Sequence, residues 1–96
     1  MTIGVIARVK IAPGQEQAFE ALFAEQAEQV RANEPANRLY RLFRDRAEPG
    51  GYIVMEIYDD EAALEAHRAA PHMLANRPRM APLLGGKTVV EIYDAA

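Results

Sequence analysis

The sequence predicts an α+β fold in which a four-stranded antiparallel sheet carries two helices on one face. Stretches with alternating apolar and polar residues, typical of β-strands, flank two stretches whose apolar residues recur at helical spacing. Their order is strand, helix, strand, strand, helix, strand, so the second half of the chain repeats the first. This is the order of the split βαβ, or ferredoxin-like, arrangement βαββαβ.

The first strand and the first helix are separated by the breaker Pro13-Gly14. Before the breaker, the apolar residues alternate and are Ile3, Val5, Ala7 and Val9. From Gln15 to Asn33 they fall at helical spacing and are Phe19, Leu22, Phe23, Ala27 and Val30. Glu34-Pro35 ends this helix, because the residue before a proline is disfavoured in the α-helical region.

The second and third strands are predicted to pair as an antiparallel hairpin. Leu39–Arg44 and Tyr52–Tyr58 both alternate, and Glu48-Pro49-Gly50-Gly51 between them has the composition of a turn. Asp59-Asp60-Glu61 then supplies N-cap candidates and favourable negative charge for a second helix that runs to about Ala70.

Three prolines interrupt the region that follows. Pro71 ends the second helix, and Pro78 and Pro82 break the helix-like stretch from His72 to Leu84. We therefore expect short helical turns in this stretch rather than one helix. Gly85-Gly86 then opens the last strand, Thr88–Tyr93.

Both faces of the predicted sheet are apolar. The third strand places Ile53, Met55 and Ile57 on one face and Tyr52, Val54 and Tyr58 on the other. Two helices cover only one face, so the other needs a cover that this chain does not supply. The sequence therefore predicts a homodimer in which two sheets pack face to face.

Composition restricts the cellular setting and the partners. The 96 residues suit a single domain spanning 1–96, and without cysteine there is neither a disulfide framework nor a thiolate metal site. The N-terminal residues resemble a strand rather than a signal peptide, so we expect a cytoplasmic protein. Because the net charge is −3 and no apolar run is long enough to span a bilayer, we expect neither a nucleic-acid partner nor a membrane partner.

The two histidines are the candidate catalytic residues. His67 follows Leu64 by three positions and lies on the apolar face of the second predicted helix, so its side chain is directed toward the sheet. Two interpretations are open: a buried histidine bonded to a carbonyl, which is the commoner case, and a general base in a cavity. His72 follows Pro71, where capping or solvent exposure is the commoner role and a second catalytic group is the alternative.

Metal and cofactor sites are not expected. Positions five apart lie on different faces of a continuous helix, which separates His67 from His72, and there is no glycine-rich phosphate loop. Glu56, in the middle of an apolar strand, is interpreted as the partner of Arg8, Arg41 or Arg44 in an ion pair across the sheet or a dimer interface.

Several segments resemble the antibiotic biosynthesis monooxygenase (ABM) domain family. They are VKIAPGQE at 9–16, LYRLFRD at 39–45, YDDEAALEAHRAAPH at 58–72 and APLL at 81–84. The histidine pair five residues apart, after an acidic helix start, is similar to the quinol-monooxygenase-like members. The resemblance implies a homodimeric α/β barrel that oxidises a small aromatic hydroquinone or anthrone with O2, without metal, haem or flavin.

For the site, the resemblance implies His67 as the base and His72 as a second base or oxyanion partner. The candidates for the wall of the substrate pocket are Phe23, Leu42, Met55 and Met73.

Two further branches of the family are compared with this chain. The haem-degrading members have asparagine, tryptophan and histidine where this chain has Ala7, His67 and Arg77, which argues against that branch. An isomerase branch that acts on a phosphorylated autoinducer-2 derivative resembles the chain around His67 and Pro71-His72. That isomerase and a non-catalytic small-molecule-binding module remain the alternatives to the monooxygenase.

Overall fold

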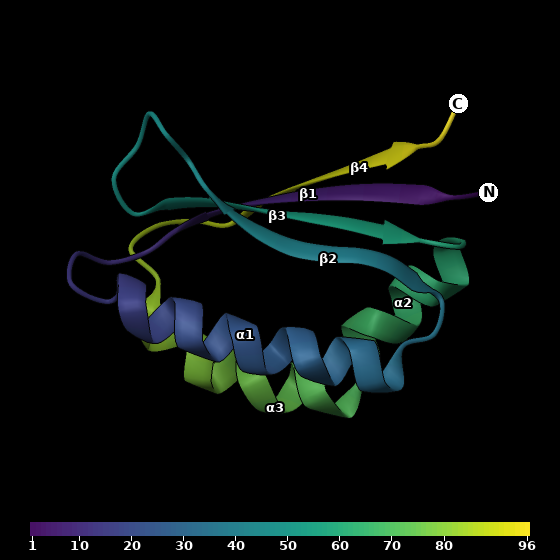
Figure 1. The fold of residues 1–96 in the computed structure, drawn as a ribbon, viewed down its shortest axis with the longest axis horizontal. Helices are drawn as coiled ribbons and strands as arrows, with labels where there is room; N and C mark the ends of the chain where they lie inside the picture. The colour runs from purple at the N-terminus through teal and green to yellow at the C-terminus, as the bar shows by residue number, and fades with distance from the viewer.

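A computed structural model describes residues 1–96 and contains one antiparallel sheet with helices on a single face (Figure 1). The strands are β1 (Ile3–Lys10), β2 (Asn37–Arg44), β3 (Gly51–Tyr58) and β4 (Val89–Asp94), in the spatial order β2-β3-β1-β4. The helices are α1 (Glu16–Asn33), α2 (Glu61–Ala69) and α3 (Pro71–Met80), followed by a 3-10 turn at Ala81–Leu83. The predicted α+β, ferredoxin-like fold is confirmed.

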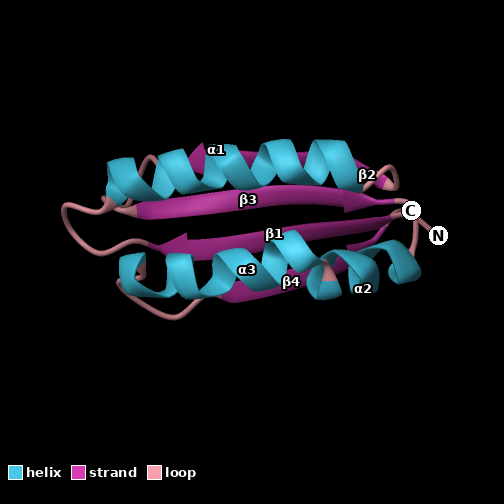
Figure 2. Cartoon of the chain, turned by 90° about the horizontal axis from the view of Figure 1, so that it is seen from below, coloured by secondary structure: helices cyan, strands magenta, loops and turns pink.

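The helices form one layer and the sheet forms the other. Figure 2 shows α1 running beside the α2 and α3 pair on the same face of the sheet. Between these layers the buried apolar side chains gather, including Ile3 and Val5 of β1, Phe19 and Val30 of α1, and Tyr58 of β3. None of the helices has the length and the hydropathy that a membrane-spanning segment requires.

The strand register decides which side chains meet the helices. Ile3 of β1 lies opposite Tyr58, and Val5 lies opposite Glu56. Because side chains alternate along a strand, Tyr52, Val54, Glu56 and Tyr58 all face the helix layer, and all four are buried. One polar side chain, that of Glu56, is thereby placed in the middle of the core.

The prediction of short helical turns after Pro71 is wrong for most of that region. α3 is one helix of 10 residues that continues through Pro78. Pro71 occupies its first turn, where the missing N–H has no intrahelical partner in any case. Pro78 lies in its last turn, so the helix loses only the bond to the carbonyl of Leu74, whose residue is exposed. The expected break does occur near Pro82, in the 3-10 turn.

The second face of the sheet carries no helix (Figure 1). Met55 on β3 and Phe43 on β2 are both exposed there, as are Val89 and Tyr93 on β4. Arg8 of β1 and Glu91 of β4, which form an ion pair at 2.9 Å, lie on the same face. The uncovered face is thus apolar with a few charges.

Candidate active site

A cavity of about 210 Å³ lies between the helix layer and the sheet, and we call it the inner cavity. Its walls come from β1, α1, β2, β3, α2 and α3, and most of them are apolar. Among its lining residues are Phe23, Tyr40, Val54, Glu56, His67 and Met73.

His67 projects into the site from the last turn of α2. Its side chain is only 6% exposed, and its Nδ1 lies 2.8 Å and 3.0 Å from the two carboxylate oxygens of Glu34. Its Nε2 makes no such close contact and lies 3.8 Å from Glu56 Oε1. The rings of Tyr40 and Tyr58 flank the imidazole at centroid distances of 5.4 Å and 5.2 Å.

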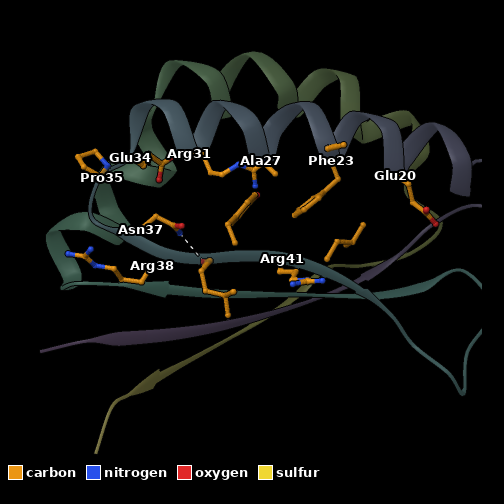
Figure 3. A pocket seen from close by; sticks show the side chains of 13 residues that line it. Glu20, Phe23, Ala27, Arg31, Glu34, Pro35, Asn37, Arg38 and Arg41 are labelled. Carbon is orange, nitrogen blue, oxygen red and sulfur yellow. Dashed lines mark hydrogen bonds between the residues drawn. The ribbon is translucent and has the colours of Figure 1, made fainter.

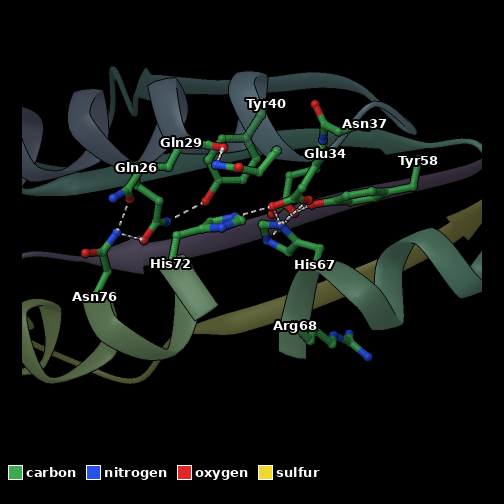
Figure 4. A network of polar contacts seen from close by, with 12 residues as sticks. Gln26, Gln29, Glu34, Asn37, Tyr40, Tyr58, His67, Arg68, His72 and Asn76 are labelled. Atoms are coloured by element: carbon green, nitrogen blue, oxygen red, sulfur yellow. Dashed lines mark hydrogen bonds and ion pairs between the residues drawn. The ribbon is translucent and has the colours of Figure 1, made fainter. Parts of the chain in front are cut away.

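Glu34 brings the two histidines together. It is the C-cap residue of α1, and its side chain is 10% exposed. Its Oε1 contacts His67 Nδ1, and its Oε2 lies 2.5 Å from His72 Nε2 (Figure 4). A carboxylate at a helix C-terminus is disfavoured by the helix dipole, so the two imidazoles supply the compensating hydrogen bonds.

A sharp change of direction at Ala70 lets both histidines reach one carboxylate. Ala70 has φ −63° and ψ 141°, which is extended backbone between α2 and α3. The argument that positions five apart face different ways holds for a continuous helix, whereas His67 and His72 lie on two helices that meet at this residue. His72, like His67, is nearly buried, with 9% of its side chain exposed.

The expected ion pair between Glu56 and an arginine is wrong. Arg8 pairs with Glu91 and Arg44 with Glu20, while the Arg41 guanidinium lies over the Phe43 ring. Glu56 instead accepts a hydrogen bond of 2.6 Å from the Tyr58 hydroxyl inside the core. Strand parity explains the difference, since Glu56 faces the helices together with Tyr58, and Arg8 and Arg41 face the other way.

Burial moves the pKa values of the side chains around the inner cavity. Loss of solvation raises the pKa of Glu56 to about 7, against the opposing hydrogen bond from Tyr58. Loss of solvation also lowers the pKa of His67, although the Glu34 carboxylate opposes this effect. Burial raises the pKa of both Tyr40 and Tyr58, so both remain phenols. Neutral His67 therefore stands beside a carboxyl group that is readily protonated.

An amide network braces α3 against α1 at one end of the site. Gln26 Nε2 donates to the Tyr40 hydroxyl oxygen at 2.6 Å, and Asn76 Nδ2 donates to Gln26 Oε1 at 3.2 Å and to Gln29 Oε1 at 2.8 Å (Figure 4). Gln26 and Asn76 are buried polar residues whose hydrogen bonds are satisfied. The network sets the position of α3, and hence of His72, relative to α1.

The four residues predicted for the pocket wall do not all meet. Phe23 and Met73 line the inner cavity with His67. Leu42 packs against the cluster around Phe23 but lines a different hollow, the open groove of about 710 Å³ between α1 and β2 (Figure 3). Met55 is a correction: strand parity turns it to the uncovered face of the sheet, away from His67.

Glu34, Glu56 and the amide network are the site residues that sequence reasoning missed or misplaced. For Glu34 there was a signal, because an acidic residue at the end of a helix opposes the dipole and requires a partner. For Glu56 the parity of β3 was the signal, since Tyr52, Val54 and Tyr58 share its face. Nothing in the spacing of Gln26 and Asn76 indicates that they meet across 50 residues.

A second hollow lies on the outer side of Glu34, and we call it the outer groove. Its volume is about 570 Å³, and it runs between the α1–β2 connection and α2. Its lining residues are Asn33–Asn37, Ala63, Ala66, Ala69, Ala70, Pro71 and His72. No set of three histidine, cysteine or acidic side chains has an arrangement suited to a metal ion.

Known proteins share both the sequence pattern and the fold. A family model described as antibiotic biosynthesis monooxygenase matches residues 2–79. A crystal structure of a candidate antibiotic biosynthesis monooxygenase from Caulobacter crescentus CB15 is 37% identical, covers 99% of this chain and 90% of that chain, and superimposes with a TM-score of 0.96.

Two further solved structures have the same fold. A protein from Mycobacterium tuberculosis is 28% identical over 100% of this chain and 96% of its own, with a TM-score of 0.89. A variant of SnoaB, a cofactor-independent oxygenase from Streptomyces nogalater, is 20% identical over 98% of this chain and 92% of its own, with a TM-score of 0.83. The match of the family model over most of the chain, together with the Caulobacter relative, shows that this chain belongs to the antibiotic biosynthesis monooxygenase (ABM) family.

Proposed function

We propose that the protein is a cofactor-independent monooxygenase of the quinol-oxidising type, which oxidises a small aromatic hydroquinone or anthrone with O2. Membership of the ABM family supports a monooxygenase-like role. The observation that carries the proposal is the arrangement of His67, which lines the inner cavity with its Nδ1 held by Glu34 and its Nε2 3.8 Å from Glu56, another lining residue. Such a cavity, below the ~300–1,000 Å³ of common drug-sized sites, suits a small substrate.

His67 acts as the general base. Its Nδ1–H donates to the Glu34 carboxylate, which selects the tautomer whose Nε2 carries a lone pair. Because burial lowers its pKa, His67 is neutral and able to accept a proton at neutral pH. The Nε2 atom takes the proton of a substrate hydroxyl and leaves an electron-rich phenolate in an apolar cavity.

Oxygen reacts with this anion without a further redox group. O2 in its triplet state takes one electron from the anion, and the resulting superoxide and substrate radical combine at a ring carbon to form a peroxide anion. The proton returned by His67 goes to the outer oxygen and gives a hydroperoxide. Its O–O bond then breaks heterolytically while the hydrogen on the same ring carbon leaves as a proton, so that a C=O group remains on the substrate and the departing hydroxide takes this proton to become water. Substrate and O2 thus yield the oxygenated product and one water molecule.

Glu56 stabilises the oxygen anion. Its carboxyl group lines the inner cavity beside His67 Nε2, and its pKa of about 7 leaves a large protonated fraction at neutral pH. A protonated carboxyl group donates a hydrogen bond to negative charge that develops nearby. Tyr58, which donates to Glu56 Oε1, holds the carboxyl group in place.

The inner cavity favours this reaction over isomerisation of a sugar phosphate. A bound phosphate needs cationic or clustered N–H donors, and no arginine or lysine is among the residues that line the inner cavity. Aromatic rings, by contrast, are well matched by Phe19, Phe23 and Tyr40 in its wall.

We further propose that the protein is a homodimer. The uncovered face of the sheet bears Ile53, Met55 and Ile57 of β3, with Ile6 of β1 opposite Met55. Face-to-face packing of two such sheets removes these side chains from water and supports the sheet wall of each inner cavity.

Oxygen uptake by metal-free protein, on addition of a menadiol-like hydroquinone, tests the proposed reaction. We expect His67→Ala to lower kcat/KM by roughly 10²–10⁴-fold, the usual contribution of a general base. Glu65→Ala, an exposed change on the same helix, serves as the matched control and should keep full activity.

The comparison with spontaneous oxidation decides the outcome. If wild-type protein and His67→Ala both consume oxygen at the uncatalysed rate, the monooxygenase proposal fails. Isomerisation of a phosphorylated ketose without oxygen consumption identifies the isomerase, and thermal stabilisation by a hydroquinone without turnover identifies a binding module.

A further inference from the structure

The Glu34 carboxylate joins the two histidines in one continuous chain of hydrogen bonds. His67 Nδ1 lies 2.8 Å from Glu34 Oε1, and Glu34 Oε2 lies 2.5 Å from His72 Nε2 (Figure 4). The three side chains come from the end of α1, the end of α2 and the start of α3. Each is at least nine-tenths buried, so the contacts are shielded from competing water.

The two ends of this series of hydrogen bonds lie at different cavities. His67 lines the inner cavity, where the proposed substrate binds, whereas Glu34 and His72 line the outer groove. The polar atom of His72 that Glu34 leaves free is Nδ1. Glu34 therefore connects the inner cavity to the outer groove through its two oxygens.

We propose that His67, Glu34 and His72 form a reversible proton relay between the inner cavity and the outer groove. The inference rests on the proposed function, because it assigns how His67, once it has taken the substrate proton, exchanges protons with solvent. In this role Glu34 and His72 do not touch the substrate and act through His67.

The hydrogen-bond positions allow the protons to be followed in both directions. When Nε2 of His67 takes the substrate proton, the Nδ1 proton passes to Glu34 Oε1. The proton between Glu34 Oε2 and His72 Nε2 moves onto His72, whose Nδ1 proton leaves to water in the outer groove. No proton is created or lost, and His67 ends with a proton on Nε2 alone.

The return journey restores the starting state. A proton from the outer groove enters at His72 Nδ1 and travels back through Glu34 to His67 Nδ1. The imidazole, which now carries both protons, gives its Nε2 proton to the outer oxygen of the peroxide, which departs as water when the O–O bond breaks. The imidazole thus regains its first tautomer without a ring flip. A ring packed between Tyr40 and Tyr58 could flip only slowly.

Chemical rescue of His72→Ala tests the relay, because the deletion opens onto the outer groove and leaves room for a small molecule. With the hydroquinone assay we expect kcat to fall by roughly 10²-fold, the lower end of the contribution of a positioned proton-transfer group, with KM changed less than about twofold. Imidazole should restore kcat in proportion to its concentration. The 1,3-dimethylimidazolium ion, which matches the shape but has no exchangeable proton, should not.

The rescue distinguishes proton transfer from packing. Restoration by both compounds assigns His72 a packing role, and restoration by neither, or unchanged kcat in His72→Ala, also overturns the relay. In Glu34→Gln we expect a lowered kcat that imidazole does not restore, because the missing carboxylate lies between the two histidines and not at the outer groove.

A measurement without substrate separates this inference from the proposed function. In ¹⁵N-resolved NMR spectra of wild-type protein, the relay requires His67 to carry its proton on Nδ1 and His72 to carry one on Nδ1. Glu34→Gln should change the ring signals of both histidines. If these signals behave as expected but no oxygen is consumed, the proposed function fails. If oxygen is consumed but the two rings respond independently, the relay fails.

Discussion

At the scale of single residues, two acidic side chains in the same core differ because their surroundings differ. Two imidazole nitrogens lie 2.5–2.8 Å from the Glu34 carboxyl oxygens. Glu56 accepts a hydrogen bond from the Tyr58 hydroxyl, and loss of solvation raises its pKa to about 7. One acid therefore orients the base, and the other is available as a hydrogen-bond donor.

Replacement of Glu56 by glutamine should alter the pH profile. In wild-type protein, the rate should fall at low pH as His67 becomes protonated and fall again above about pH 7 as Glu56 ionises. Glu56→Gln keeps a donor and an acceptor for Tyr58 but cannot ionise, so the decline at high pH should disappear. The pH dependence of kcat/KM for oxygen uptake measures this, and a decline that persists in Glu56→Gln contradicts the role of Glu56.

The same variant has a stability readout that does not depend on activity. Because folding raises the pKa of Glu56 from 4.5 to about 7, the folded protein binds the extra proton and loses stability as pH rises through this interval. Between pH 4 and pH 8, Glu56→Gln should therefore gain roughly 3 kcal/mol relative to wild type, at about 1.4 kcal/mol per pKa unit. Denaturant unfolding at both pH values measures it, and a constant difference means that Glu56 is not perturbed.

At the scale of elements, the site depends on where three helices end. α1 ends just before Glu34, α2 ends just after His67, and α3 begins just before His72. Asp60 starts α2 as its N-cap, with its side chain accepting from the Ala63 N–H at 2.8 Å. Because α2 has only nine residues, the cap that fixes its start also affects the position of its last turn, which carries His67.

Loss of this cap should weaken the fold measurably. Asp60→Ala removes the acceptor for the Ala63 N–H and should cost about 1 kcal/mol of stability, which corresponds to a fall in Tm of roughly 4–8 °C for a domain of this size. Asp60→Asn retains an acceptor oxygen and should lose far less. Circular dichroism during heating gives both values, and equal losses in the two variants would show that the cap is not the cause.

At the scale of the whole molecule, helices cover one face of the sheet and leave the other uncovered (Figure 1). The side chains that line the inner cavity and those that form the proposed dimer interface alternate along the same strands. Glu56 and Met55, for example, are neighbours in sequence and point to opposite faces of β3. A partner sheet would therefore rest on the back of the wall that holds Glu56.

A charge at the centre of the uncovered face should prevent dimerisation. Met55→Asp places a carboxylate opposite its own image or against apolar side chains, which costs several kcal/mol of association free energy unless the charge is paired. Sedimentation equilibrium at micromolar concentration should give a dimer for wild type and a monomer for Met55→Asp. Gln17→Asp, on the exposed side of α1, is the charge-matched control and should stay dimeric. A monomeric wild type contradicts the dimer.

Local patterns in the sequence determined the elements, their order and the sheet face on which each residue lies. Periodicity and turn chemistry act over a few residues, so they predicted the four strands, α1 and α2, and the two apolar faces of β3. The same local rules placed His67 toward the sheet. They failed at Pro78, because a proline in the last turn of a helix removes only one backbone hydrogen bond and does not break the helix.

Only the tertiary structure decided what the histidines do. Glu34 is 33 residues from His67 and 38 from His72 in sequence, and no local pattern reports that the end of α1 meets the bend at Ala70. The desolvation that sets the pKa of Glu56 likewise comes from helices packed over the sheet. The elements follow from short-range sterics and hydrogen bonding, whereas the proton chemistry depends on distances and burial that exist only once these elements have packed together.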